Sequence, residues 1–288
     1  MNSFSSPAYS AIVPEVLEQE DIVTYNAISN GGSELINLAG PLLGIIALDT
    51  FGPRWAIILN GISFLLSAIA ESFLRYTEKE VTTTKEESTI DQIRNGLVYL
   101  FSRKDVLLLV GLSAIVNFSL AGYNYLAPFF NFLSPKGYGS ILVAQGIGSI
   151  FAAGITSFSR KYRISLKKML LQLGCCGLAL CFIPLAFQTE KAVLRFLPFA
   201  VFGFFLALYN IAFFSFVQDT VEDNYLGRVF SIIFTMAVLF MPLGTLISTV
   251  LLKTDSVEGF CYVGIFITVT SLLAFCIKWF FQRSTKKE

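Results

Sequence analysis

The chain has 288 residues, of which 55% are hydrophobic and 14% charged, and its net charge at pH 7 is +1. A soluble domain carries about a quarter charged residues, so this composition excludes an ordinary soluble protein and predicts lipid surroundings. The small net charge argues against a nucleic-acid partner, which requires a clustered basic excess. Because the chain has no histidine, histidine-based metal sites and catalytic triads are excluded. We expect no enzyme activity, no metal site and no cofactor.

Eight segments have the roughly 20 mostly apolar residues that a helix needs to cross a bilayer. The first, Ile28–Leu48, is the weakest, since it contains Glu34 and Asn37. The segments do not alternate between apolar and polar residues as the strands of a membrane barrel do. We therefore predict an all-α integral membrane bundle of about eight transmembrane helices. The seven later spans are Trp55–Phe73, Val106–Phe129, Ser140–Phe158, Met169–Phe187, Phe196–Phe216, Val229–Leu251 and Gly259–Phe280.

The composition changes between the second and third spans, where the chain becomes polar. In the second part of this segment Ile90, Ile93, Leu97 and Leu100 recur at helical spacing and predict an amphipathic helix on the inner membrane surface. The expected order is a cytoplasmic N-terminal segment, two helices, a central cytoplasmic loop, a complete six-helix half and a cytoplasmic tail. The corresponding residues are 1–27, 28–73, 74–105, 106–281 and 282–288.

Positive charge predicts the orientation of the spans. Fifteen of the 21 Lys and Arg residues lie in connections on one side, five lie on the other, and Lys278 falls inside the last span. Cytoplasmic loops carry the excess of Lys and Arg. We therefore expect a multi-pass protein of the plasma membrane with both termini in the cytoplasm.

Three short motifs occur in order along the chain. They are Pro7-Ala8 with Val13-Pro14-Glu15-Val16 and Asn26-Ala27, then Gly40-Pro41-Leu42-Leu43-Gly44, then Gln218-Asp219 with Gly227-Arg228-Val229-Phe230-Ser231. Together with the layout of two spans, a long loop and six spans, they resemble the major facilitator superfamily, in particular the bacterial macrolide-efflux and enterobactin-export proteins. The resemblance implies helices 5–12 of a twelve-helix transporter, and thus an N-terminally truncated chain that lacks the first four helices.

The resemblance implies a secondary active transporter that exports small amphipathic compounds, such as macrolide-like drugs or siderophore-like molecules, in exchange for protons. The alternative is a truncated, non-transporting membrane protein that is inert or acts only with a separate chain supplying the missing helices. Gly40, Pro41 and Gly44 are similar to the family's antiporter motif. Their expected physical role is packing, because a pair of glycines four residues apart lets helix backbones approach closely.

Glu34 is the outstanding polar residue within a span. An ionisable side chain at membrane depth is costly and marks a functional site by default, so Glu34 is the candidate for proton coupling. A carboxylate that reaches the cytoplasmic headgroups or pairs with a neighbour is equally compatible with the sequence.

Other polar residues within the spans are candidates for the substrate cavity. In the superfamily, the helix equivalent to the third span lines that cavity, and its amide and phenol groups can orient a largely apolar ligand. Simple hydrogen bonding between helices is the alternative. The candidates are Asn117, Tyr123, Asn124, Gln145 and Asn210.

Two cytoplasmic connections are candidate gate loops. Arg160, Lys161 and Arg163 follow the fourth span at the position of the family's second basic gating loop, and Gly227 and Arg228 precede the seventh span. Salt bridges that hold the inward gate shut are one role. Determination of topology by positive charge alone is the other.

Overall fold

The computed structural model describes residues 9–14, 16–73, 89–130, 137–158 and 165–284. These residues are helical apart from short turns, and no described residue forms a strand. The predicted all-α membrane bundle is therefore confirmed. The labelled helices are α2 (Ile22–Ser72), α3 (Thr89–Ser102), α4 (Lys104–Phe129), α5 (Gly137–Phe158), α6 (Leu166–Cys181), α7 (Ile183–Phe187), α8 (Ala192–Thr220), α9 (Asp223–Leu251) and α10 (Glu258–Ser284).

Seven described helical segments are long and apolar enough to cross a membrane. They coincide with the seven later spans of the sequence analysis to within a few residues. The weakest expected span, 28–48, is helical within α2 but is not among the seven. The segments are Asp49–Ala70, Val106–Phe129, Gly137–Phe158, Leu166–Phe187, Ala192–Thr220, Asn224–Leu251 and Glu258–Lys278.

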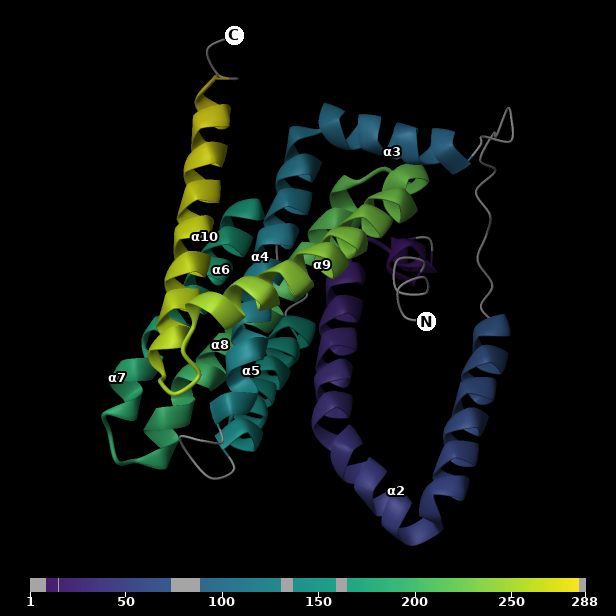
Figure 1. Ribbon diagram of the computed structural model, residues 1–288. Coiled ribbons are helices and arrows are strands. Elements are labelled where there is room, and N and C mark those ends of the chain that lie inside the picture. Colours follow the sequence, from purple (N-terminus) through teal and green to yellow (C-terminus); the bar gives the residue numbers. More distant parts are fainter. Residues whose placement is uncertain (1–8, 15, 74–88, 131–136, 159–164, 285–288) are drawn as a thin grey trace.

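Helix α2 is a V of two arms (Figure 1). The bend is at Gly52, whose φ of 75° and ψ of 165° are non-helical. A positive φ favours glycine because other side chains clash with the backbone there. We call residues 22–51 the first arm and residues 53–72 the second arm. The first arm packs on α5 and α8, whereas the span Asp49–Ala70, which includes most of the second arm, buries none of its apolar window against described residues.

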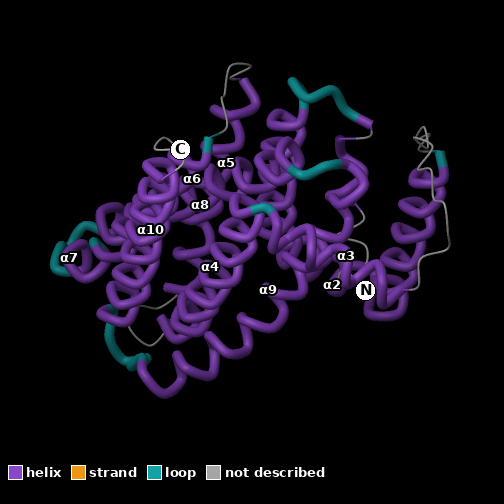
Figure 2. The backbone as a smooth tube through the Cα atoms, turned by 90° about the horizontal axis from the view of Figure 1, so that it is seen from above, coloured by secondary structure: helices purple, strands orange, loops and turns teal. Residues whose placement is uncertain are grey.

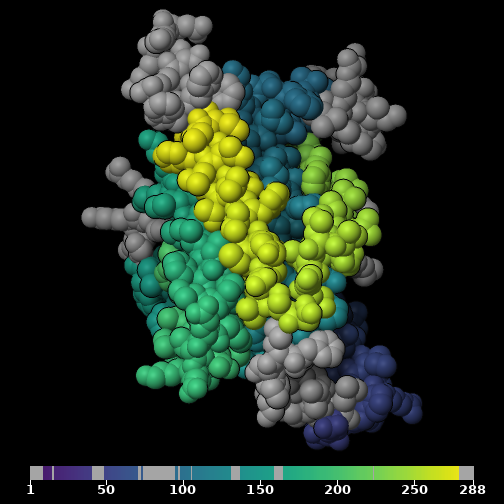
Figure 3. Space-filling view, turned by 60° about the vertical axis from the view of Figure 1, so that its left-hand side comes forward, coloured from purple at the N-terminus to yellow at the C-terminus, as the bar shows by residue number. Residues whose placement is uncertain are grey.

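Helices α4 to α10 form the bundle, in which α5 packs on α8, α6 on α10 and α8, and α4 on α9. Seen from above, the bundle is gathered on one side and the second arm of α2 stands apart (Figure 2). Figure 3 shows α10 between α9 on one side and the green helices α6 to α8 on the other. Close to α7, the fully buried Phe130 packs edge-on against Phe199 and Phe260, with ring centroids 5.9 and 6.1 Å away.

Glycine permits the close crossing of α5 and α8. A Cβ atom on Gly148 would overlap the carbonyl oxygen of Ala200, and one on Gly203 would overlap the carbonyl oxygen of Gln145. Ser149 Oγ adds a hydrogen bond of 3.2 Å to the carbonyl oxygen of Gly203. Small residues at such crossings drive helix association in lipid, where burial of apolar surface gives no net gain.

The amphipathic helix predicted from residues 90–100 is α3, which lies across the end of the bundle near the start of α9 (Figure 1). Tyr99 stacks on Tyr225 of α9 with ring centroids 4.2 Å apart. The backbone N–H of Glu222 donates a hydrogen bond of 3.3 Å to the Tyr99 hydroxyl, and Arg103 forms an ion pair with the Glu222 carboxylate at 3.4 Å. These contacts fix α3 to the start of α9.

Candidate functional site

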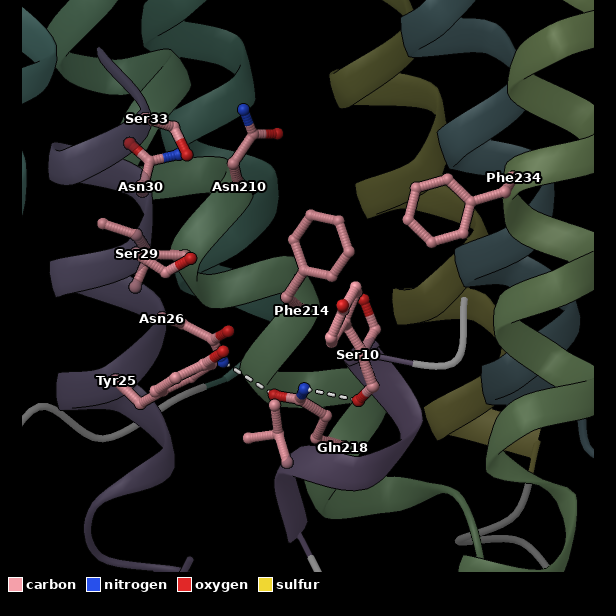
Figure 4. A pocket seen from close by; sticks show the side chains of 13 residues that line it. Ser10, Tyr25, Asn26, Ser29, Asn30, Ser33, Asn210, Phe214, Gln218 and Phe234 are labelled. Atoms are coloured by element: carbon pink, nitrogen blue, oxygen red, sulfur yellow. Dashed lines mark hydrogen bonds between the residues drawn. The ribbon is translucent and has the colours of Figure 1, made fainter. Parts of the chain in front are cut away.

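A polar cavity of about 500 Å³ lies between the N-terminal part of the chain and helices α8 and α9. One wall comes from residues 9–13 and the first arm of α2, and the other from residues 210–218 of α8 and Phe234 of α9 (Figure 4). The two walls come from segments on either side of the central loop. The cavity therefore lies where two groups of helices meet.

At one end of the cavity, hydrogen bonds join residues about 200 positions apart. Asn26 Nδ2 donates to Ser215 Oγ at 2.9 Å and to Gln218 Oε1 at 2.7 Å. Gln218 Nε2 in turn donates to the backbone carbonyl of Ser10 at 2.8 Å. Ser215 and Gln218 are buried. This network, drawn in part in Figure 4, ties the first arm of α2 to the end of α8.

At the other end of the cavity, polar side chains of α2 and α8 line the wall. Asn30 and Ser33 of α2 lie opposite Asn210 of α8 (Figure 4). The Asn30 Oδ1 atom is buried without a hydrogen-bond partner among the described residues. A buried acceptor without a partner is unfavourable by about 1–3 kcal/mol.

Aromatic rings form the wall between the two ends. Phe214 of α8 and Phe234 of α9 both line the cavity, and their ring centroids are 6.2 Å apart. Phe230 packs behind both rings at 5.9 and 6.4 Å, so the wall is held by the buried part of the bundle. The cavity thus combines amide and hydroxyl groups with a rigid apolar surface.

Glu34 is half-buried on the first arm of α2, directly after Ser33. It does not line the cavity, but it lies near enough to the Tyr123 hydroxyl for an electrostatic interaction. It makes no hydrogen bond or ion pair with any residue of the described ranges. Glu34 therefore lies beside the cavity and next to the bundle, without an ion-pair partner among the described residues.

Of the five residues predicted to form the cavity, Asn210 lines it. Tyr123 and Gln145 pair with each other across α4 and α5, the tyrosine hydroxyl donating to Gln145 Oε1 at 2.8 Å. Asn117 Nδ2 donates to the carbonyl oxygen of Ser113 in its own helix at 2.8 Å, and Asn124 is exposed. These four residues, three on α4 and Gln145 on α5, do not line this cavity, and their part in substrate binding stays a prediction.

The glycine motif of α2 is not a crossing point for the described helices. A Cβ atom on Gly40 would have no described atom within 4 Å. The close approach expected from Gly40 is therefore absent within the described residues. For residues 41–48, which include Pro41 and Gly44, the structure describes the helical backbone but not the side chains.

The structure describes one of the two candidate gate loops. Arg160, Lys161 and Arg163 lie outside the described residues. Gly227 and Arg228 lie within α9, which begins at Asp223, so they belong to its first turns rather than to a loop. The Arg228 guanidinium lies over the Tyr225 ring at 5.4 Å. A Cβ atom on Gly227 would be 3.8 Å from that of Ala11, which brings the third motif beside the N-terminal segment.

The sequence analysis did not select Asn26, Asn30 or Gln218 for the cavity. Asn26 and Gln218 each belong to a quoted motif, and the structure joins these two motifs by a direct hydrogen bond. A local signal was present on α2, where polar residues recur every three or four positions and so share one face of a helix. These residues are Asn26, Asn30, Ser33 and Asn37.

An all-helical membrane bundle with a site between two groups of helices is the architecture of secondary transporters built from two halves. A profile of the Major Facilitator Superfamily matches residues 1–245, and the chain belongs to that superfamily. An uncharacterized MFS-type transporter of Bacillus subtilis (strain 168), YfiS, is 27% identical over 247 residues. The match covers 81% of this chain and 57% of the relative, so the chain spans little more than half the length of the curated relative it matches.

Proposed function

We propose that the protein acts in secondary active transport, exporting small amphipathic compounds across the plasma membrane. The observation that carries this proposal is the polar cavity of about 500 Å³ between the first arm of α2 and α8. In transporters of this type, one group of helices rocks against the other around a site at their interface. The hydrogen bonds of Asn26 and Gln218 would close one end of the site and would break when that end opens.

Glu34 is the residue that we propose for proton coupling. It is half-buried beside the cavity and has no ion-pair partner among the described residues. An unpaired carboxylate at membrane depth is costly when charged. Proton binding removes that cost, so movement of Glu34 between wet and dry surroundings would couple proton transfer to rocking of the helices.

We also propose that the transporting unit contains further helices, supplied by a separate chain, that cover the second arm of α2. The span Asp49–Ala70 buries none of its apolar window within the described structure, and Gly40 faces open space. The same exposure favours the second candidate function, a membrane protein that does not transport by itself. Both candidates predict that the chain alone inserts in the membrane without transporting.

The proposed orientation places both termini and α3 in the cytoplasm, on the basis of the positive charges. In a cysteine-free variant, a cysteine at Gly139 is expected to react with an impermeant thiol reagent added to intact cells. A Cβ atom at Gly139 meets no described atom within 4 Å. A cysteine at Ser284 is expected to react only after lysis. Labelling of the Ser284 variant in intact cells would reverse the orientation.

Efflux of a macrolide tests the function directly. Cells would express the chain alone or together with the first four helices of a twelve-helix superfamily transporter. We expect efflux above the empty-vector level only in the second case, and loss of that efflux when an uncoupler collapses the proton gradient. Efflux by the chain alone would contradict the need for further helices. No efflux in either case would contradict the transport proposal.

The proton role is tested in the same cells with Glu34→Gln, which keeps the shape of the side chain but cannot release a proton. We expect uncoupler-sensitive efflux to fall by about tenfold or more, with membrane insertion unchanged. Asp49→Asn is the matched control, since Asp49 is exposed near the bend of the same helix. Unchanged efflux in Glu34→Gln would assign this carboxylate a structural role.

A further inference from the structure

From the lining of the cavity, we infer that its ligand is a neutral molecule with several hydroxyl or amide groups on one side and an apolar ring face on the other. This inference deepens the proposed function and rests on it. It narrows the broad class of small amphipathic compounds to uncharged ones. It follows from three features of the described lining, namely free amides, the absence of charged side chains and an aromatic wall.

The free amides require hydrogen-bonding groups on the ligand. Asn30 and Asn210 both line the cavity, and neither amide makes a hydrogen bond to a described residue. The Oδ1 atom of Asn30 is buried, so Asn30 offers the ligand its donor hydrogens, whereas Asn210 offers an acceptor oxygen and two donor hydrogens. Because hydroxyl and amide groups both donate and accept, a ligand that carries several of them can bond to both asparagines at once. A purely apolar ligand would make neither bond and would bind weakly.

Charge on the ligand is disfavoured by the same lining. None of the lining residues that the structure describes is Asp, Glu, Lys or Arg. Near the end of the cavity where Asn26 bonds to Gln218, Asp219 accepts a hydrogen bond from Gln19 at 3.1 Å and does not line the cavity. A buried ionised group without an opposite charge is strongly unfavourable. The described lining therefore offers no opposite charge to a carboxylate or an ammonium group on the ligand.

The aromatic wall sets the shape of the apolar face. Phe214 and Phe234 present a ring surface backed by Phe230. The C–H face of a sugar ring or a flat aromatic ring packs against such a surface, while its hydroxyl groups point to the opposite side. The volume of about 500 Å³ lies within the range of about 300–1,000 Å³ that is typical of sites for small molecules.

The test compares two probes that differ in one group. 4-Nitrophenyl β-glucoside carries an aromatic ring and a neutral sugar, and the matching glucuronide has a carboxylate in place of the hydroxymethyl group. Binding to the full chain in lipid nanodiscs would be measured by isothermal titration calorimetry. We expect the glucoside to bind at least about tenfold more tightly than the glucuronide. Equal affinities, tighter binding of the glucuronide or no binding of the glucoside would overturn the inference.

Variants locate the binding. Asn30→Leu and Asn210→Leu keep the approximate volume and remove the amide, so each is expected to weaken glucoside binding by about tenfold. Asn37→Leu is the matched control on the same helix, because Asn37 is exposed and does not line the cavity. Unchanged affinity in both cavity variants would overturn the inference. Glucoside binding with the expected selectivity but without efflux would contradict the transport proposal alone.

Discussion

Two membrane-length segments of this protein, α5 and the span Asp49–Ala70, are both apolar, yet they have opposite surroundings. Helix α5 packs on α8 and on the first arm of α2. The span Asp49–Ala70 buries none of its apolar window, and its Phe64 is 70% exposed. Apolarity therefore fits a helix for the membrane but does not decide what the helix packs on.

The difference lies in small residues and in polar groups at the crossing points. At the crossing of α5 and α8, Gly148 and Gly203 allow the backbones to touch, and Ser149 bonds across the interface. The corresponding Gly61 of the second arm has no described atom within 4 Å of an added Cβ. In lipid, close packing and hydrogen bonds drive association. Matched substitutions should therefore lower the free energy of unfolding more in the bundle than in the second arm.

The largest difference in stability loss between the bundle and the second arm is expected for a phenylalanine. Phe130→Ala removes a ring that is 1% exposed and edge-packed against Phe187, Phe199 and Phe260. We expect it to lower the free energy of unfolding by about 3–5 kcal/mol, measured by SDS titration in a mild detergent. Phe64→Ala in the second arm should change it by no more than about 0.5 kcal/mol. Similar losses in both variants would show that the second arm is packed in the folded protein.

A smaller difference in stability loss is expected for a glycine. In Gly148→Ala, the added methyl group meets the backbone of Ala200, so the helices must separate. The expected loss is about 2 kcal/mol in the same titration. Gly61→Ala adds a methyl group in open space and replaces glycine by a better helix former, so it should be neutral or slightly stabilising. A tolerated Gly148→Ala would contradict the close crossing of α5 and α8.

The smallest difference in stability loss is expected for a serine. Ser149→Ala removes a buried hydrogen bond to the carbonyl oxygen of Gly203, and hydrogen bonds between membrane helices contribute about 0.6 kcal/mol on average. Among the described residues, Ser63 bonds to the carbonyl oxygen of Asn60 in its own arm. Ser63→Ala is therefore expected to leave the free energy of unfolding unchanged within error. A larger loss for Ser63→Ala than for Ser149→Ala would reverse the comparison.

Much of the fold could be predicted from the sequence, because a bilayer sets the length and apolarity of each span directly. The limits of seven spans and the position of α3 followed from these local signals. The packing of the spans did not, because it depends on which face of each helix carries its small residues and which partner lies opposite. A helix such as α4, apolar on nearly every face, has no amphipathic stripe that would fix its rotation.

The cavity was harder to predict for the same reason. Asn117 and Asn124 were selected because the resemblance implies that their helix lines the substrate cavity. Neither lines the cavity between α2 and α8, since Asn117 bonds within α4 and Asn124 is exposed elsewhere. Asn26 and Gln218 were visible as parts of motifs, but their partnership spans 192 residues and has no local signature. Asn210, an isolated amide within a strongly apolar helix, is the candidate that lines this cavity, and its part in substrate binding stays a prediction.

The central claim is that the first arm of α2 and the end of α8 close one end of a transport cavity and must separate during export. Asn26→Cys with Ser215→Cys, in a cysteine-free background, places two thiols where a hydrogen bond of 2.9 Å now joins the side chains. A short bifunctional thiol reagent should link them. The efflux seen with the covering helices co-expressed should then stop, and a reductant should restore it.

The control pair is Asn60→Cys with Ser63→Cys, which links two positions one turn apart within the second arm. It should form the same kind of link without loss of efflux, because no described helix must move relative to another there. Loss of efflux confined to the linked Asn26–Ser215 pair is the result that the proposed mechanism predicts. Full efflux by protein in which that link has formed completely would contradict it.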